Sequence, residues 1–235
     1  MADIIRQIRQ TLKSLADEKV RQSGQRFFKE AVKMYGVKTP VVRRIAKEFF
    51  VSLKDKSKTE IFTLCEKLWQ SGVIEEAFAA CEWTARKHKA LEVDDFPLLE
   101  RWITQYITNW AACDTFCNHT VGTFVEMYPK YVKELKRWAK SDNLWQRRAA
   151  AVSLIIPARK GLFQQDIFAI AKILLTDSED MVQKGYGWML KAAADFDTPS
   201  VFNFVMDNKN TMPRTALRYA VEKMPPALKI KAMQR

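Results

Sequence analysis

The stretch Ser57–Gly72, SKTEIFTLCEKLWQSG, contains the signals of one complete amphipathic helix. Ser57 and Glu60 have the spacing of a capping box, in which each side chain pairs with a backbone N–H at the start of a helix. Ser71-Gly72 is a typical end of a helix. Between these marks, apolar residues recur at steps of three and four, which places them on one helical face: Ile61, Leu64, Cys65, Leu68 and Trp69.

The same apolar spacing continues along almost all of the 235 residues, without a convincing alternation of apolar and polar residues that would indicate strands. Other helix starts are predicted at Thr39-Pro40, Ser141-Asp142-Asn143, Thr198-Pro199 and Met212-Pro213. We expect helices of about 10 to 18 residues joined by short loops, as in stacked helical hairpins.

A faint internal similarity favours a repeat architecture. Trp145–Ala150 (WQRRAA) aligns with Val182–Gly187 (VQKGYG) at a spacing of 37 residues, and Glu75–Ala80 has a related character. A helix-pair period near 40 is typical of HEAT and armadillo repeats, although an up-down helical bundle can produce the same similarity by chance. We therefore expect an all-α, HEAT-like or armadillo-type α-solenoid of stacked antiparallel helix pairs, forming a single domain over residues 1–235.

Cysteine and histidine usage predicts neither disulfides nor a metal site. The relevant residues show no C-x-x-C pair and no zinc-ligand spacing: Cys65, Cys81, Cys113, Cys117, His88 and His119. The amino terminus lacks a signal-peptide pattern, and no segment reaches the roughly 18 apolar residues of a membrane span. We expect a cytoplasmic protein with reduced thiols and no membrane partner.

The formal charge of +12 is concentrated in the carboxy-terminal half. Residues 130–160 contain nine basic and two acidic residues, and residues 205–235 contain seven basic and two acidic ones, whereas the rest of the chain is balanced. A concentrated basic surface commonly binds a phosphate backbone. Simple solubility is the alternative explanation of the charge.

The segment Asn109–Cys117, NWAACDTFC, places a carboxylate among apolar neighbours. In a helix, Trp110 and Asp114 are one turn apart and share a face. A partly desolvated carboxylate could there stabilise a developing cation or deprotonate water. The structural alternative is that Asp114 caps a following helix, which is the more common role for aspartate on these residues alone.

Two further segments contain candidate residues. Trp188 follows two glycines in GYGWML, and glycines within a helical pattern indicate close approach of another backbone, either DNA or a helix. Core packing is the more common role for such a tryptophan. Arg147 and Arg148 adjoin at the start of a predicted helix, where a phosphate contact and a solvated charge pair are equal alternatives.

Four segments together resemble the AlkD-type family of DNA alkylation-repair proteins, which are HEAT-like DNA glycosylases. They are Tyr35–Arg44 (YGVKTPVVRR), Trp110–Asp114 (WAACD), Ser141–Ala150 (SDNLWQRRAA) and Gln183–Trp188 (QKGYGW). The resemblance covers most of the chain, and its specificity comes from the combination of the segments.

The resemblance implies that Asp114 is the catalytic carboxylate and that Trp110 and Trp188 form an aromatic wall beside a damaged base. Active members tend to have a tyrosine near the lesion where this chain has Phe27, which keeps the ring without the hydroxyl. The family also implies a mechanism in which the damaged base is not flipped into a pocket, unlike most glycosylases.

The resemblance further implies that Arg148 contacts the DNA backbone near the lesion. We also expect DNA contacts from three basic residues within the matching segments: Arg147, Lys184 and Arg43. The implied reaction is hydrolysis of the N-glycosidic bond of cationic 3- or 7-alkylated purines in duplex DNA. Neither a metal nor an organic cofactor is implied, and nothing in the sequence requires more than a monomer.

Two other functions remain alternatives. One is a non-catalytic HEAT-repeat protein that binds distorted or branched DNA, because the superfamily includes paralogues without excision activity. The other is a protein-binding solenoid with an incidental basic face. A steep fall of DNA affinity with rising salt distinguishes the DNA-binding functions from the protein scaffold.

Overall fold

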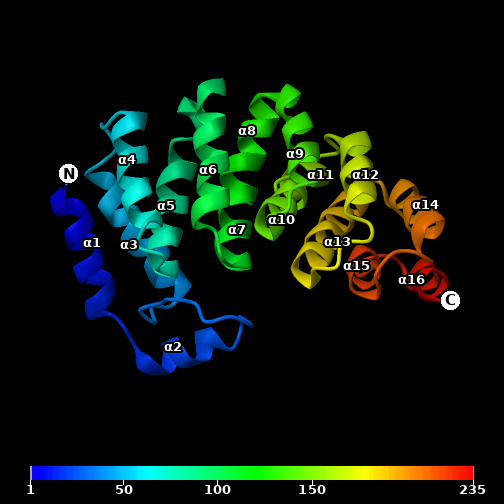
Figure 1. Ribbon diagram of the computed structural model, residues 1–235, viewed down its shortest axis with the longest axis horizontal. Coiled ribbons are helices and arrows are strands. Elements are labelled where there is room, and N and C mark those ends of the chain that lie inside the picture. The colour runs from blue at the N-terminus through cyan, green and yellow to red at the C-terminus, as the bar shows by residue number, and fades with distance from the viewer. Residues whose placement is uncertain (1, 235) are drawn as a thin grey trace. The chain divides into compact units, whose positions relative to one another are not determined.

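The computed structural model describes residues 2–234, and all regular secondary structure in that range is helical (Figure 1). The predicted all-α class is confirmed. The chain forms two compact units that meet in the sequence between Phe116 and Cys117. The single domain over residues 1–235 stays a prediction.

The first unit is organised around α5, which packs against α3, α4 and α7. In Figure 1, α2 lies below the other helices of this unit and runs across their direction. Residues 26–38, which we call the 26–38 segment, link α2 to α3 without regular structure. The helices are α1 (Ala2–Ser14), α2 (Glu18–Gln25), α3 (Thr39–Val51), α4 (Lys58–Trp69), α5 (Ile74–Arg86), α6 (Phe96–Tyr106) and α7 (Trp110–Phe116), with short 3-10 turns at His88–Ala90 and Val93–Asp95.

Large aromatic side chains fill the core of the first unit. Trp69, Trp102 and Phe116 are fully or almost fully buried, and their ring centroids lie 5.6 to 6.3 Å apart. The indole of Trp83 is also buried and donates a hydrogen bond of 2.8 Å to the Ala46 carbonyl, which joins α5 to α3. Because each buried indole removes a large apolar area from water, these residues supply much of the stabilisation that fixes α5 and α7.

The second unit is organised around α13, which packs against α10, α11, α12, α14 and α15. The elements are the π-helical turn η3 (Cys117–Val121), α8 (Gly122–Met127), the 3-10 turn η4 (Pro129–Tyr131), α9 (Val132–Trp138), α10 (Leu144–Val152), α11 (Ile155–Arg159), α12 (Gln164–Ile173), α13 (Asp180–Ala194), α14 (Thr198–Asn208), α15 (Arg214–Ala220) and α16 (Pro226–Met233).

Small residues allow the central helices of this unit to lie close together. A Cβ atom at Gly187 would lie 2.7 Å from the Cβ of Tyr219 and 2.8 Å from the Ala216 carbonyl oxygen, so α13 and α15 could not pack as they do with a larger residue there. Of the two neighbours predicted for this glycine, DNA or a helix, the structure therefore shows a helix. Helix α10, which also packs against α13, contains three consecutive buried alanines, residues 149–151.

The predicted helix starts are confirmed, and the predicted lengths are confirmed for the longer helices, such as α3, α4 and α13. Pro40 lies at the first turn of α3, Ser57 and Glu60 form the capping box of α4, and Asn143 caps α10 with hydrogen bonds to two backbone N–H groups. The expectation of about 10 to 18 residues is wrong for shorter helices such as α11, with five residues. The chain turns after α11 at Gly161, which has a φ of 75°, and again at Phe163, which has a φ of 60°. An α-helix cannot contain either conformation.

Candidate functional site

Helix α7 places Trp110 and Asp114 one turn apart, as the sequence predicts. The helix is capped by Asn109, whose side-chain oxygen accepts a hydrogen bond of 2.9 Å from the Ala112 N–H. The chain continues from α7 directly into the π-helical turn, so Asp114 lies within helical structure and the capping role considered for it is wrong. Its side chain is mostly buried, with 9% of the residue exposed.

Trp110 contacts the 26–38 segment through both its ring and its nitrogen. Its ring stacks on Phe28 with a centroid distance of 5.5 Å and an interplanar angle of 27°. Its Nε1 donates a hydrogen bond of 3.2 Å to the Phe27 carbonyl oxygen. The Phe27 side chain is 71% exposed, whereas Phe28 is half-buried. The structure therefore brings Phe27 to Trp110 through its backbone, and Phe28 is the stacking partner.

Phe28 is a site residue that the sequence reasoning missed. The family resemblance points to the neighbouring Phe27, and two adjacent phenylalanines are identical in chemistry, so the sequence does not distinguish them. In an irregular segment there is no helical or strand period that would tell which of two successive side chains points inward.

An apolar pocket of 230 Å³ lies between the 26–38 segment and helices α2, α3, α5 and α7 of the first unit. Four aromatic rings contribute to its lining: Phe27, Phe28, Phe78 and Trp110. Planar apolar walls of this kind suit an aromatic ring, and π-faces stabilise a positive charge on it. The pocket can thus accept part of a flat, cationic heterocycle.

The carboxylate of Glu75 holds the 26–38 segment in place. It is 2% exposed and accepts three backbone N–H groups, from Tyr35 at 3.0 Å, from Gly36 at 2.8 Å and from Val37 at 3.0 Å. Gly36 has a φ of +96°, and a Cβ there would lie 2.4 Å from the Asp17 carbonyl oxygen, so only glycine fits. The backbone conformation that these three hydrogen bonds require therefore explains why a glycine lies between Tyr35 and Val37.

A second buried carboxylate reinforces the same anchor. Glu76 is 1% exposed and accepts hydrogen bonds from the Tyr35 hydroxyl at 2.5 Å and from Arg9 at 2.8 Å. Burial, followed by the hydrogen bond and charge of Glu76, raises the pKa of the Tyr35 hydroxyl. The hydroxyl therefore stays protonated and continues to donate its hydrogen bond at neutral pH.

In the second unit, the two adjacent arginines of α10 contact different parts of the chain. Arg148 is 4% exposed and donates a hydrogen bond to the Met181 carbonyl oxygen at the start of α13. Arg147 forms an ion pair of 2.6 Å with Asp177 and donates to the carbonyl oxygens of Ser141 and Asp142. Arg148 therefore connects α10 to the first turn of α13, and Arg147 connects it to the segment that leads into α13.

Helix α13 carries the other two site residues predicted in the second unit. Lys184 and Trp188 are four residues apart on this helix, so their side chains leave it on the same side. Lys184 pairs with Asp180 at 2.6 Å and is about one-third exposed, and Trp188 is half-buried. The structure thus places Lys184 and Trp188 on one helix that also contacts Arg148.

Arg43 lies apart from the aromatic pocket within the first unit. It is exposed on α3 and is not among the residues that line the pocket. Its position leaves the guanidinium accessible to a partner, and its role as a DNA contact stays a prediction.

Within residues 2–234, no group of three or more His, Cys, Asp or Glu side chains is arranged to hold a metal ion. No helix in this range is both long and apolar enough to cross a bilayer. All four cysteines are buried, and burial raises the pKa of the Cys65 thiol to about 12, which keeps it protonated.

Comparisons with known proteins agree with this fold. Residues 8–224 match the family model described as DNA alkylation repair enzyme. A solved structure described as "Predicted DNA alkylation repair enzyme from Enterococcus faecalis" matches with a TM-score of 0.81 and 14% identity, over 90% of this chain and 97% of that chain. No curated protein matches the chain.

The structural match confirms the predicted class of stacked helix pairs. Because the sequence identity is only 14%, this match is evidence of the fold alone. The family match extends over most of the sequence and includes all four segments that carry the resemblance described above. From this match, the protein belongs to the family of DNA alkylation repair enzymes.

Proposed function

We propose that this protein is a monofunctional DNA glycosylase that hydrolyses the N-glycosidic bond of cationic alkylated purines, of the 3-methyladenine and 7-methylguanine type, in duplex DNA. One observation carries the proposal. A carboxylate, Asp114, lies one helical turn from Trp110, whose ring lines an apolar pocket with other aromatic side chains. This combination suits a flat cationic base and a positively charged transition state.

The proposed chemistry requires little of the protein because an alkylated purine is already a good leaving group. The bond between the sugar C1′ and the purine nitrogen breaks, and its electron pair leaves with the base, which becomes neutral. Asp114 stabilises the oxocarbenium-like sugar and accepts a proton from the water that attacks C1′. The products are the free base and an abasic site, and neither a metal nor an organic cofactor takes part.

In this proposal Trp110 and Trp188 contact the lesion, together with Phe27 and Phe28 of the 26–38 segment. The remaining predicted contacts are to the DNA backbone, from Arg148, Arg147, Lys184 and Arg43. The charge distribution supports this assignment, because residues 117–235 contain 19 Lys and Arg against 11 Asp and Glu. Such an excess attracts duplex DNA and steers its approach. We propose that the protein acts as a monomer.

The test compares the protein with an Asp114→Asn variant on duplex DNA that contains 7-methylguanine. Released base is measured in single-turnover reactions, and DNA affinity is measured in parallel. We expect the variant to release base about 100- to 1,000-fold more slowly, as expected when one electrostatic contact to the transition state is removed. Its affinity for DNA should be nearly unchanged. Asp142→Asn, at an exposed position, is the matched control and should keep full activity.

The same experiment separates the glycosylase from the alternative function. Tight DNA binding by the wild-type protein without release of base would refute the glycosylase and favour a protein that only binds altered DNA. Equal rates for the wild type and Asp114→Asn would remove Asp114 from the mechanism.

A further inference from the structure

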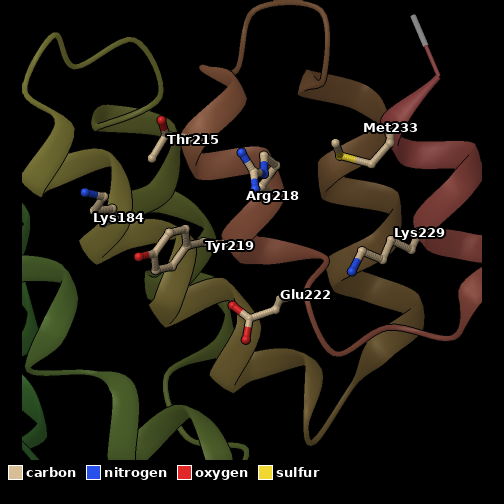
Figure 2. A pocket seen from close by; sticks show the side chains of 7 residues that line it. All are labelled: Lys184, Thr215, Arg218, Tyr219, Glu222, Lys229 and Met233. Carbon is tan, nitrogen blue, oxygen red and sulfur yellow. The ribbon is translucent and has the colours of Figure 1, made fainter.

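A second pocket, in the carboxy-terminal unit, lies between α13, α15 and α16 and has a volume of 490 Å³. Figure 2 shows the side chains that line it. Lysine, arginine and threonine side chains from three helices contribute to this lining: Lys184 of α13, Thr215 and Arg218 of α15, and Lys229 of α16. The pocket is therefore rich in hydrogen-bond donors, and its lysine and arginine donors also carry positive charge.

Contacts between neighbouring helices hold the walls of this pocket in place. The close approach of α13 and α15 at Gly187 sets one wall. Arg214 donates a hydrogen bond of 3.0 Å to the Met233 carbonyl oxygen, and Lys209 donates one of 2.6 Å to the Gln234 carbonyl oxygen. The first bond fixes the end of α16 against the start of α15, and the second fixes it against the end of α14. The backbone around the pocket is thus held in place before a ligand binds, so binding does not have to order it.

The negative charge of the pocket is already compensated. Glu222 lines the pocket and forms an ion pair of 2.9 Å with Lys191, which also lies over the Tyr219 ring at 5.4 Å. Arg218 and Lys229 are exposed, and neither forms an ion pair with a carboxylate within residues 2–234. These two cations therefore leave the pocket with positive charge that an anionic ligand can neutralise.

We propose that this pocket binds a backbone phosphate of duplex DNA through Arg218 and Lys229, with the Thr215 hydroxyl as a further donor. The guanidinium of arginine matches the geometry of phosphate oxygens, and lysine adds a point charge. The partner rests on the proposed function, in which the protein binds DNA. The pocket shares Lys184 with the predicted DNA contacts, and Lys184 leaves α13 on the same side as Trp188. A strand that follows this side of α13 would reach the pocket.

The test measures duplex affinity over a range of salt concentrations for the wild type and an Arg218→Gln/Lys229→Gln double variant. Loss of one neutralised phosphate should make the slope of log K against log salt less steep by about 0.9. If the contact contributes nothing at about 1 M salt, affinity should fall about 15-fold at 50 mM and about 4-fold at 200 mM. Undamaged and damaged duplexes should lose affinity equally, because phosphates carry no base information.

A Lys54→Gln/Lys89→Gln double variant removes the same charge from exposed residues that neither line the pocket nor belong to the basic carboxy-terminal half. It should leave the slope close to that of the wild type. A slope for the Arg218→Gln/Lys229→Gln variant equal to the wild-type slope would overturn the proposal, as would an equal change in the control.

Two further measurements identify the source of the phosphate and separate this proposal from the glycosylase. In the first, inorganic phosphate is titrated into the wild type and the Arg218→Gln/Lys229→Gln variant by calorimetry. If the variant no longer binds inorganic phosphate but binds duplex DNA as tightly as the wild type, the assignment of the pocket to DNA is overturned. Release of 7-methylguanine from saturating DNA should be the same in the double variant as in the wild type. A changed salt slope without base release from either protein would support phosphate binding in the pocket and refute only the glycosylase activity. Base release with an unchanged salt slope would overturn only phosphate binding in the pocket.

Discussion

Replacement of Glu75 by glutamine tests whether one buried carboxylate holds the 26–38 segment against the aromatic pocket. In the wild type, one carboxylate oxygen accepts the N–H groups of Gly36 and Val37, and the other accepts that of Tyr35. A glutamine can keep its carbonyl oxygen on the first two groups. Its amide nitrogen then faces the Tyr35 N–H, so two donors oppose each other in a site that is almost fully buried.

The expected loss follows from these three bonds. A hydrogen bond to a charged group contributes about 1.5 to 3 kcal/mol, and a neutral one about half as much. Glu75→Gln removes one charged bond and weakens two, while it also avoids the cost of burying a charge. We therefore expect the free energy of opening the segment to fall by about 2 to 3 kcal/mol, which corresponds to about 30- to 150-fold faster exchange of the amides.

Hydrogen exchange followed by mass spectrometry on peptides that cover residues 35–37 measures this effect directly. Glu82→Gln on the same helix is the matched control, because Glu82 forms only a partly exposed ion pair with Arg86. That variant should change stability by less than about 0.5 kcal/mol and leave exchange at residues 35–37 unaltered. Exchange less than about threefold faster in Glu75→Gln would refute the role assigned to the carboxylate.

Two further changes have outcomes that the structure predicts. Gly187→Ala should lower the free energy of unfolding by about 1 to 3 kcal/mol in thermal or urea denaturation, because its Cβ would lie 2.7 Å from that of Tyr219. Gly185→Ala meets its first neighbour at 3.3 Å and should cost less, so equal losses would contradict this packing. The Ser57 backbone N–H, then Lys56 and the Ser57 hydroxyl, lower the pKa of Glu60 from 4.5 to about 2. The stabilisation from Glu60 is thus complete above pH 4.5 and is lost as the pH falls towards 2. Glu60→Gln should flatten this part of the pH–stability profile, and an unchanged profile would show that the capping box does not contribute.

The secondary structure could be predicted because its signals are local. The capping box of α4, the proline at the start of α3 and the Asn143 cap of α10 each depend on residues within one turn of the helix end. Helix lengths were less predictable. The short α11 is followed by Gly161 and Phe163, both with a positive φ. Glycine is a common sequence signal for that conformation after a helix, whereas phenylalanine gives none.

The candidate site was predictable only in part. The i,i+4 spacing of Trp110 and Asp114 on α7 follows directly from helical geometry, as does that of Lys184 and Trp188 on α13. The choice between Phe27 and Phe28 does not, because it is made by packing against Trp110, a residue more than 80 positions away in the sequence.

The sequence by itself determined that the chain is helical, where most helices begin, and that its positive charge gathers in the carboxy-terminal half. These properties depend on neighbouring residues and on composition, so they do not require the fold. Only the tertiary structure showed that Glu75 anchors the backbone of Tyr35–Val37 and that Gly187 allows α15 to pack closely against α13. It also showed that Arg218 and Lys229 line one pocket. These contacts join residues that are distant along the chain, and their energies arise only when folding brings the partners together.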